Sequence, residues 1–345
     1  MATHPRITKC EILWSRTCPL SCSYCNMADG RRNSVVLTDW FKGFDQLKQL
    51  GCSFAAFYGA EPLIDFDKLP EVIDFAESLG IHTTVITSGC VSDLTYRLKT
   101  LYNHGLRSIT ASYDPLAADR SSQYKSAKAK EVIDIFRSFG PVRDSAIVVT
   151  LSRENYHVLP ELIVEMTAKN IWTFFDLIHP DRGQPGSKVK NTDLDLLFKK
   201  EDFVPLLAVL QKVGEMKKKG YLCHSSYAFF ETIKLVGAYM QTVPDNPIAP
   251  YIWNCSDYDC FPSWITVDTQ GDCHPCDDFY TTDTSIIKIW EIADLWDKFC
   301  KIWKPVVKEK CPGCLWGTHL DSHLIKRGLL PMTDYIHGLE KTNET

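Results

Sequence analysis

The stretch "ITKCEILWSRTCPLSCSYCN", residues 7–26, places a β-rich run directly before three closely spaced cysteines. Cys18, Cys22 and Cys25 follow this run with the spacing CxxxCxxC. Three thiolates at this spacing can wrap one face of a compact [4Fe–4S] cube and leave its fourth iron without a protein ligand. A zinc site normally takes four protein ligands, and no histidine follows at zinc-finger spacing. The stretch therefore predicts an iron–sulfur cluster after the first strand.

The alternation of a β-rich run with a helical segment continues to about residue 220. Five further β-rich runs occupy residues 52–58, 82–87, 106–113, 145–151 and 172–178. Amphipathic segments with helical spacing lie between them. Strict alternation of this kind indicates parallel βαβ units. Six units predict an α/β fold, a partial (β/α)6 TIM-type barrel, in which the chemistry lies at the C-terminal ends of the strands.

Composition narrows the classes of protein. The chain has 345 residues, 45% of them hydrophobic, and a net charge of −5, so no field that attracts nucleic acid is expected. No signal-like or membrane-spanning apolar run is present, and we expect a cytoplasmic protein without a membrane partner. In a reducing compartment its 14 cysteines are expected to be metal ligands, catalytic thiols or small core residues.

Near the C-terminus the alternating strand and helix patterns give way to a cysteine-rich sequence, which predicts a second unit. A barrel domain is expected over 1–220 and a helical connection and linker over 221–250. A small cysteine-rich domain follows over 251–325, with a tail over 326–345. Residues 264–275 are predicted to form a hairpin. Four thiolates in this unit would make either a closed [4Fe–4S] site or a zinc ribbon.

The cysteine triplet, with Tyr24 before its third member, resembles the motif of the radical S-adenosylmethionine (radical SAM) superfamily over about residues 15–185. The resemblance implies that the open iron binds the amine and carboxylate of SAM. An electron from a reductant such as flavodoxin or ferredoxin would then break the sulfonium C–S bond and release a 5′-deoxyadenosyl radical. Tyr24 matches the position that packs near adenine.

The same resemblance implies SAM contacts at the strand ends. "YGAEP", residues 58–62, stands where the family commonly has GGEP, with Ala60 in place of the second glycine. Gly59 and Ala60 would admit the methionine amine, and Glu61 offers a carboxylate. Further candidates at later strand ends are Thr87, Ser88, Ser112, Asp114, Ser152 and Arg153. For the first four of these, ordinary roles in turns and helix caps are equally good explanations.

The C-terminal unit resembles a SPASM or twitch domain, the auxiliary-cluster extension of many radical SAM enzymes. The resemblance implies a second [4Fe–4S] cluster on Cys260, Cys276, Cys311 and Cys314, with Cys255 as the alternative to Cys260. Cys273 alternates away from this set in the hairpin and is not expected to be a ligand. Because no cysteine follows Cys314, we expect a twitch-like domain with one auxiliary cluster.

For the reaction, we expect an oxidoreductase of the dehydrogenase type. The radical would remove a hydrogen atom from a small polar substrate, and the auxiliary cluster would accept the next electron. His179, Asp181 and Arg182, after the sixth strand, are candidates for the proton transfer. One alternative is a maturase of a ribosomally made peptide, disfavoured because Cys18 lies too near Met1 for a preceding recognition domain. The other is a non-enzymatic metal-binding scaffold.

Overall fold

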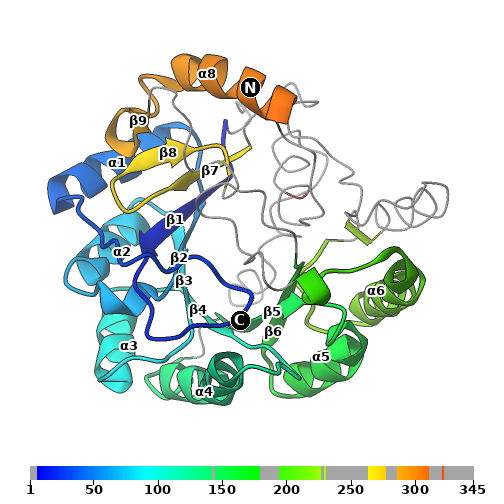
Figure 1. Ribbon diagram of the computed structural model, residues 1–345. Coiled ribbons are helices and arrows are strands. Elements are labelled where there is room, and N and C mark those ends of the chain that lie inside the picture. The colour runs from blue at the N-terminus through cyan, green and yellow to red at the C-terminus, as the bar shows by residue number, and fades with distance from the viewer. Residues whose placement is uncertain are drawn as a thin grey trace.

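The computed structural model describes residues 6–141, 144–178, 194–226, 229–230, 263–276 and 286–310, together with Asp321. Within them a nine-stranded sheet has the order β6-β5-β4-β3-β2-β1-β7-β8-β9 (Figure 1). Its first six strands pair in parallel throughout. They are β1 (Lys9–Ser15), β2 (Phe54–Gly59), β3 (His82–Thr87), β4 (Ser108–Ser112), β5 (Asp144–Leu151) and β6 (Trp172–Leu177). The six predicted strands are confirmed.

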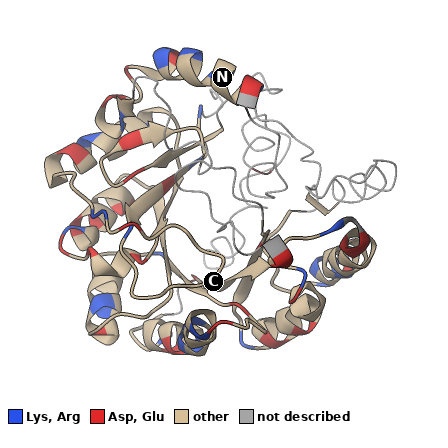
Figure 2. Ribbon diagram, viewed as in Figure 1, with Lys and Arg blue, Asp and Glu red and all other residues tan. Residues whose placement is uncertain are grey.

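Helices cover the outer, convex side of this curved sheet (Figure 1). In chain order they are α1 (Leu37–Gln49), α2 (Leu69–Ser78), α3 (Leu94–Asn103), α4 (Arg120–Arg137), α5 (Leu159–Ala168), α6 (Phe203–Lys218) and α8 (Trp296–Lys310). The alternation of strand and helix confirms the predicted partial (β/α)6 barrel. Charged residues of both signs are interspersed on these helices (Figure 2). No helix of the described chain is long and apolar enough to cross a bilayer.

Aromatic packing beside β1 positions the strand that leads into the cysteine triplet. The Trp14 ring lies 5.2 Å from Trp40 on α1 and 5.6 Å from Phe57 on β2, between centroids. Trp14 Nε1 also donates a hydrogen bond to the Asp65 carbonyl oxygen at 2.6 Å. All three rings are fully buried, and burial of a large apolar side chain contributes about 1.5–3 kcal/mol. The end of β1 is therefore held between α1 and β2.

The predicted C-terminal hairpin is confirmed as β7 (Trp264–Val267) paired antiparallel with β8 (Asp272–His274). Gly271 in the turn has a φ of +81°, which glycine adopts without steric cost. A short strand, β9 (Ile287–Lys288), pairs with β8. β7 also pairs in parallel with β1, Lys9 opposite Trp264. The hairpin therefore extends the barrel sheet, whereas the sequence suggested a separate unit.

Two of the predicted segments can be checked little or not at all. Most of the helical connection and linker over 221–250 lies outside the described residues, as does the whole tail over 326–345. The domain boundaries expected there remain predictions.

Candidate active site

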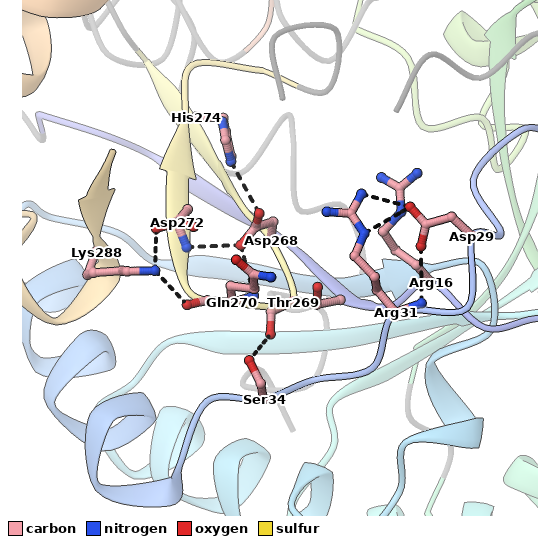
Figure 3. Close-up of polar contacts among 10 residues, drawn as sticks. All are labelled: Arg16, Asp29, Arg31, Ser34, Asp268, Thr269, Gln270, Asp272, His274 and Lys288. Carbon is pink, nitrogen blue, oxygen red and sulfur yellow. Dashed lines mark hydrogen bonds and ion pairs between the residues drawn. The ribbon is translucent and has the colours of Figure 1, made fainter. Parts of the chain in front are cut away.

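The three cysteines lie on a loop whose two ends are joined at the C-terminal end of β1. The amide of Arg16 donates to the Arg31 carbonyl oxygen at 2.9 Å, and the amides of Asp29 and Gly30 donate to the Arg16 carbonyl oxygen at 2.9 Å. Asp29 adds ion pairs to both arginines, with Arg16 Nε at 2.6 Å and Arg31 Nη2 at 2.7 Å (Figure 3). Because its ends are closed, the loop carries all three thiols on one strand end.

These thiols line a cavity of about 360 Å³ at the C-terminal ends of the strands, a volume in the range of small-ligand sites. Six of the predicted SAM contacts line the same cavity, namely Tyr24, Gly59, Ala60, Ser88, Ser112 and Asp114. Other polar residues of the lining are Glu11, Ser21, Asn26, Lys125, Thr150 and Asp176. The barrel thus brings the cysteine loop and the ends of β2, β3 and β4 to one place, as the fold predicts.

The arrangement of the thiols fits a polynuclear cluster. No three His, Cys, Asp or Glu side chains of the described ranges are grouped closely enough to hold one metal ion. The three thiols instead share the wall of one cavity, as ligands to separate irons of a cube do. Leu20 donates its amide to Cys18 Sγ at 3.4 Å. In the same part of the chain, Thr17 Oγ1 and Asn26 Oδ1 are buried and have no hydrogen-bond partner among the residues that the structure describes.

Burial controls the protonation of the cysteines. It raises the pKa of Cys18 to about 12 and also raises the pKa of Cys22, where nearby Lys125 opposes it. Without metal, the thiols of Cys18 and Cys22 are therefore protonated at neutral pH. Because metal clusters bind thiolates, loading of the site must release protons.

Gly59 allows the end of β2 to lie against the cysteine loop. Its φ is +137°, and a Cβ atom there would come within 2.2 Å of the Ser15 carbonyl oxygen. The next two amides bond to the same segment, Ala60 to the Ser15 oxygen at 2.9 Å and Glu61 to the Thr17 oxygen at 3.0 Å. Glycine is therefore required at position 59 by contact with the protein's own backbone.

Glu61 lies behind the cavity wall and is completely buried. Its Oε1 accepts hydrogen bonds from the Leu63 amide at 3.1 Å and Thr87 Oγ1 at 2.6 Å. Its Oε2 accepts from the Ser88 amide at 2.9 Å and from the Ser88 hydroxyl. Burial raises the pKa of this carboxyl, and these hydrogen bonds oppose the increase.

This geometry revises the expected role of Glu61. Both oxygens of its carboxylate already accept two hydrogen bonds each from the protein. Glu61 is also not among the residues that line the cavity. It joins the end of β2 to the end of β3 and thereby places Ser88 in the wall. Thr87 belongs to the same buried support and is likewise absent from the lining.

Two further predicted SAM contacts are not brought to the cavity. The Arg153 guanidinium pairs with Asp202, with Nε to Oδ2 at 3.2 Å and Nη2 to Oδ1 at 3.3 Å. The Ser152 amide donates to Asn155 Oδ1 at 2.9 Å. Neither Ser152 nor Arg153 lines the cavity. The end of β5 contributes Thr150 instead.

Replacement of Arg153 by alanine is expected to leave SAM affinity unchanged within about twofold. The Arg153–Asp202 pair is partly exposed, and such pairs contribute about 0.2–1 kcal/mol to stability. Isothermal titration with SAM and urea denaturation measure the two effects. A loss of SAM affinity of about tenfold or more would return Arg153 to the cofactor site.

Lys125 is a site residue that the sequence analysis missed. It lies on α4 and is only 7% exposed. Its Nζ donates to the Tyr24 hydroxyl at 2.6 Å and forms an ion pair with Asp114, to which Tyr24 also donates. The helical periodicity of α4 could have predicted its burial. Lys125 lies three residues after buried Ser122 and four before buried Ala129, on the core-facing side of the helix.

The hairpin turn is fastened to the segment that follows the cysteine loop. The Ser34 amide and hydroxyl donate to the Thr269 carbonyl oxygen at 2.9 and 3.3 Å (Figure 3). Within the hairpin, Asp268 Oδ1 accepts the Gln270 amide at 2.9 Å and the Asp272 amide at 3.0 Å. The two cysteine-bearing segments are therefore parts of one packed unit.

The proposed auxiliary site is only partly visible. Cys276 is buried just after β8, and Cys273 is a fully buried core thiol. The other proposed ligands, Cys255, Cys260, Cys311 and Cys314, lie outside the described residues, as do the proton-transfer candidates His179, Asp181 and Arg182. The second cluster and the choice between Cys255 and Cys260 stay predictions.

Comparison with protein families agrees with this site. Residues 12–164, which contain the cysteine triplet, match the family model of the Radical SAM superfamily. Members of this superfamily use SAM and a [4Fe–4S] cluster.

Curated relatives match less than half of the chain. A PqqA peptide cyclase of Xanthomonas oryzae pv. oryzae (strain MAFF 311018) is 30% identical over 172 residues, which is 47% of this chain and 45% of the relative. One of Gluconobacter oxydans (strain 621H) is 32% identical over 155 residues, 42% of each chain. The chain therefore spans less than half the length of these relatives.

Solved structures share the fold more widely. Streptococcus suis SuiB bound to precursor peptide SuiA aligns with a TM-score of 0.59 at 17% identity, over 85% of this chain and 65% of that one. Native anSMEcpe with bound AdoMet and the Cp18Cys peptide also aligns with 0.59, at 13% identity over 89% and 82%. These likenesses support the partial barrel.

Proposed function

We propose that this protein is a radical SAM enzyme that modifies a peptide. The observation that carries the enzyme class is the single cavity in which Cys18, Cys22 and Cys25 meet the ends of β2, β3 and β4. These residues belong to the segment that matches the superfamily model. The cavity is large enough for a nucleoside-sized cofactor beside a cluster-binding loop.

Different residues of the cavity would bind the cluster and SAM. Cys18, Cys22 and Cys25 would hold a [4Fe–4S] cluster, while Tyr24 and Ser88 would line the space for SAM. When bound, the two cofactors supply a 5′-deoxyadenosyl radical that removes a hydrogen atom from a substrate carbon. The electron would come from a protein such as flavodoxin or ferredoxin.

The proposed substrate class, a peptide, is inferred from the relatives and the aligned structures. The curated relatives carry the name PqqA peptide cyclase, and the two aligned structures contain a precursor peptide and a peptide. They favour the peptide alternative over the small polar substrate and dehydrogenase reaction that the sequence analysis preferred. A closed second cluster on Cys276 and the three cysteines proposed with it would accept an electron from the substrate.

Peptide stimulation of SAM cleavage tests this proposal. The anaerobically reconstituted full chain is incubated with SAM, dithionite and synthetic peptides encoded by short reading frames beside its gene. We expect one peptide to raise 5′-deoxyadenosine release about tenfold, which corresponds to a barrier lower by about 1.4 kcal/mol. Its mass should fall by two hydrogens, as a crosslink requires.

A scrambled version of the active peptide is the matched control and should leave the release unchanged. Stimulation by the low-molecular-mass fraction of a cell extract, and by no peptide, would return the substrate to the small polar class.

A further inference from the structure

The N-terminal part of α4 packs directly on the cysteine loop. The Ser21 amide donates to the Ser121 hydroxyl at 3.2 Å. One residue further, the Ser122 side chain is completely buried. Its hydroxyl lies within hydrogen-bonding reach of the Cys22 sulfur. One helical turn later, Lys125 reaches Tyr24 between the second and third cysteines.

Lys125 is a buried cation that pairs with one carboxylate. Its partners are the Asp114 carboxylate and the Tyr24 hydroxyl, and its Nζ lies 5.2 Å from the centre of the Tyr24 ring. It lines the cavity together with Cys22 and acts electrostatically on that thiol. Removing a cation from water is costly unless opposite charge lies close by. Asp114 supplies one negative charge, and a metal-bound Cys22 thiolate would supply another.

Asp114 is itself fixed by the same helix. Its amide donates to Ser126 Oγ at 2.8 Å, and Ser126 Oγ donates to the Asp114 carbonyl oxygen at 3.0 Å. Lys125 and Ser126 thus hold the side chain and the backbone of one residue at the end of β4. Helix α4 is in this way attached to both the cysteine loop and the cavity wall.

We infer that Lys125, assisted by Ser122, is a positioning residue that ties α4 to the cysteine loop and raises the reduction potential of the cluster bound there. The inference rests on the proposed function. A reduced cluster carries one more negative charge than the oxidised one, so a nearby buried cation stabilises the reduced form. Hydrogen bonds toward the cysteine sulfurs act in the same direction.

Redox titration of the reconstituted full chain tests this inference. The cube on the loop is identified as the EPR signal that SAM perturbs, and its midpoint potential is measured in Lys125→Met, Lys125→Arg and Ser122→Ala. We expect Lys125→Met to retain iron and to disfavour reduction about tenfold, a shift of about 59 mV toward negative potential for a one-electron couple. Lys125→Arg keeps the charge and should shift less.

Lys130→Met is the matched control, because Lys130 lies on the same helix but is exposed and pairs with Asp134. Its potential should equal that of the wild-type chain.

Iron retained in Lys125→Met with an unchanged potential would overturn the inference and leave the proposed function intact. If Lys125→Met fails to fold, Ser122→Ala decides: a more negative potential supports the inference, and an unchanged one overturns it. A wild-type chain without a SAM-perturbed cube would overturn the proposed function, and the inference with it.

Discussion

Replacement of Cys18, Cys22 and Cys25 by alanine is expected to remove one [4Fe–4S] cube and to abolish reductive cleavage of SAM. All three thiols line the cavity on one closed loop. With two cubes in the wild-type chain, iron should fall from about eight to about four atoms per chain. Iron and acid-labile sulfide analysis, together with 5′-deoxyadenosine release under dithionite, measure both effects.

A matched control is Cys300→Ala. Cys300 is a partly exposed thiol on α8, and its loss should change neither iron content nor SAM cleavage. SAM cleavage that persists in the triple variant would exclude the cysteine loop as the cluster site. Retention of all iron in that variant would do the same. Because the loop ends are joined through the Arg16 and Arg31 backbones, the triple variant should keep the barrel fold.

The parts of the fold that sequence reasoning predicted are those set by local pattern. Each βα unit is encoded within about 30 contiguous residues, because parallel strands need a crossover helix between them. The cysteine motif is equally local, within eight residues. The hairpin 264–275 was also found, since its turn residues and alternation are adjacent in the chain.

The pairing of β7 with β1 could not be predicted in this way. Lys9 and Trp264 face each other in the sheet although the chain between them contains the whole barrel. Their side chains interact as well, with Lys9 Nζ 4.9 Å from the Trp264 ring centre. No periodicity within one segment specifies which strand edge a distant hairpin will join.

At the candidate site, too, local sequence predicted some features, and contacts between distant residues decided the others. Six of the predicted SAM contacts line the cavity, because strand ends in a barrel meet at one edge. Which way a polar side chain turns at such an end depends on distant partners. Arg153 turns to Asp202, which a long connection separates from it in sequence. Lys125 turns inward because Asp114 is there to receive it.

Loss of the Glu61 carboxylate is expected to be the most damaging single change near the cavity. In Glu61→Ala, the amides of Leu63 and Ser88 and the hydroxyls of Thr87 and Ser88 lose their acceptor in a buried place. Removing one partner of a buried charged network typically costs about 3–5 kcal/mol. SAM affinity should fall about tenfold or more, since Ser88 in the cavity wall loses its support.

Two variants separate support of the wall from direct contact with SAM. Glu61→Gln keeps the shape and one carbonyl acceptor, so we expect it to lose about 1–3 kcal/mol of stability and less SAM affinity than Glu61→Ala. Glu71→Ala removes the same charge from the exposed side of α2 and should change neither property. Urea denaturation and calorimetric titration with SAM measure the pair of effects. A Glu61→Ala variant that lost SAM affinity but kept wild-type stability would show that the carboxylate contacts SAM itself. A residue that only supports the cavity wall cannot be removed from a buried hydrogen-bond network without lowering stability.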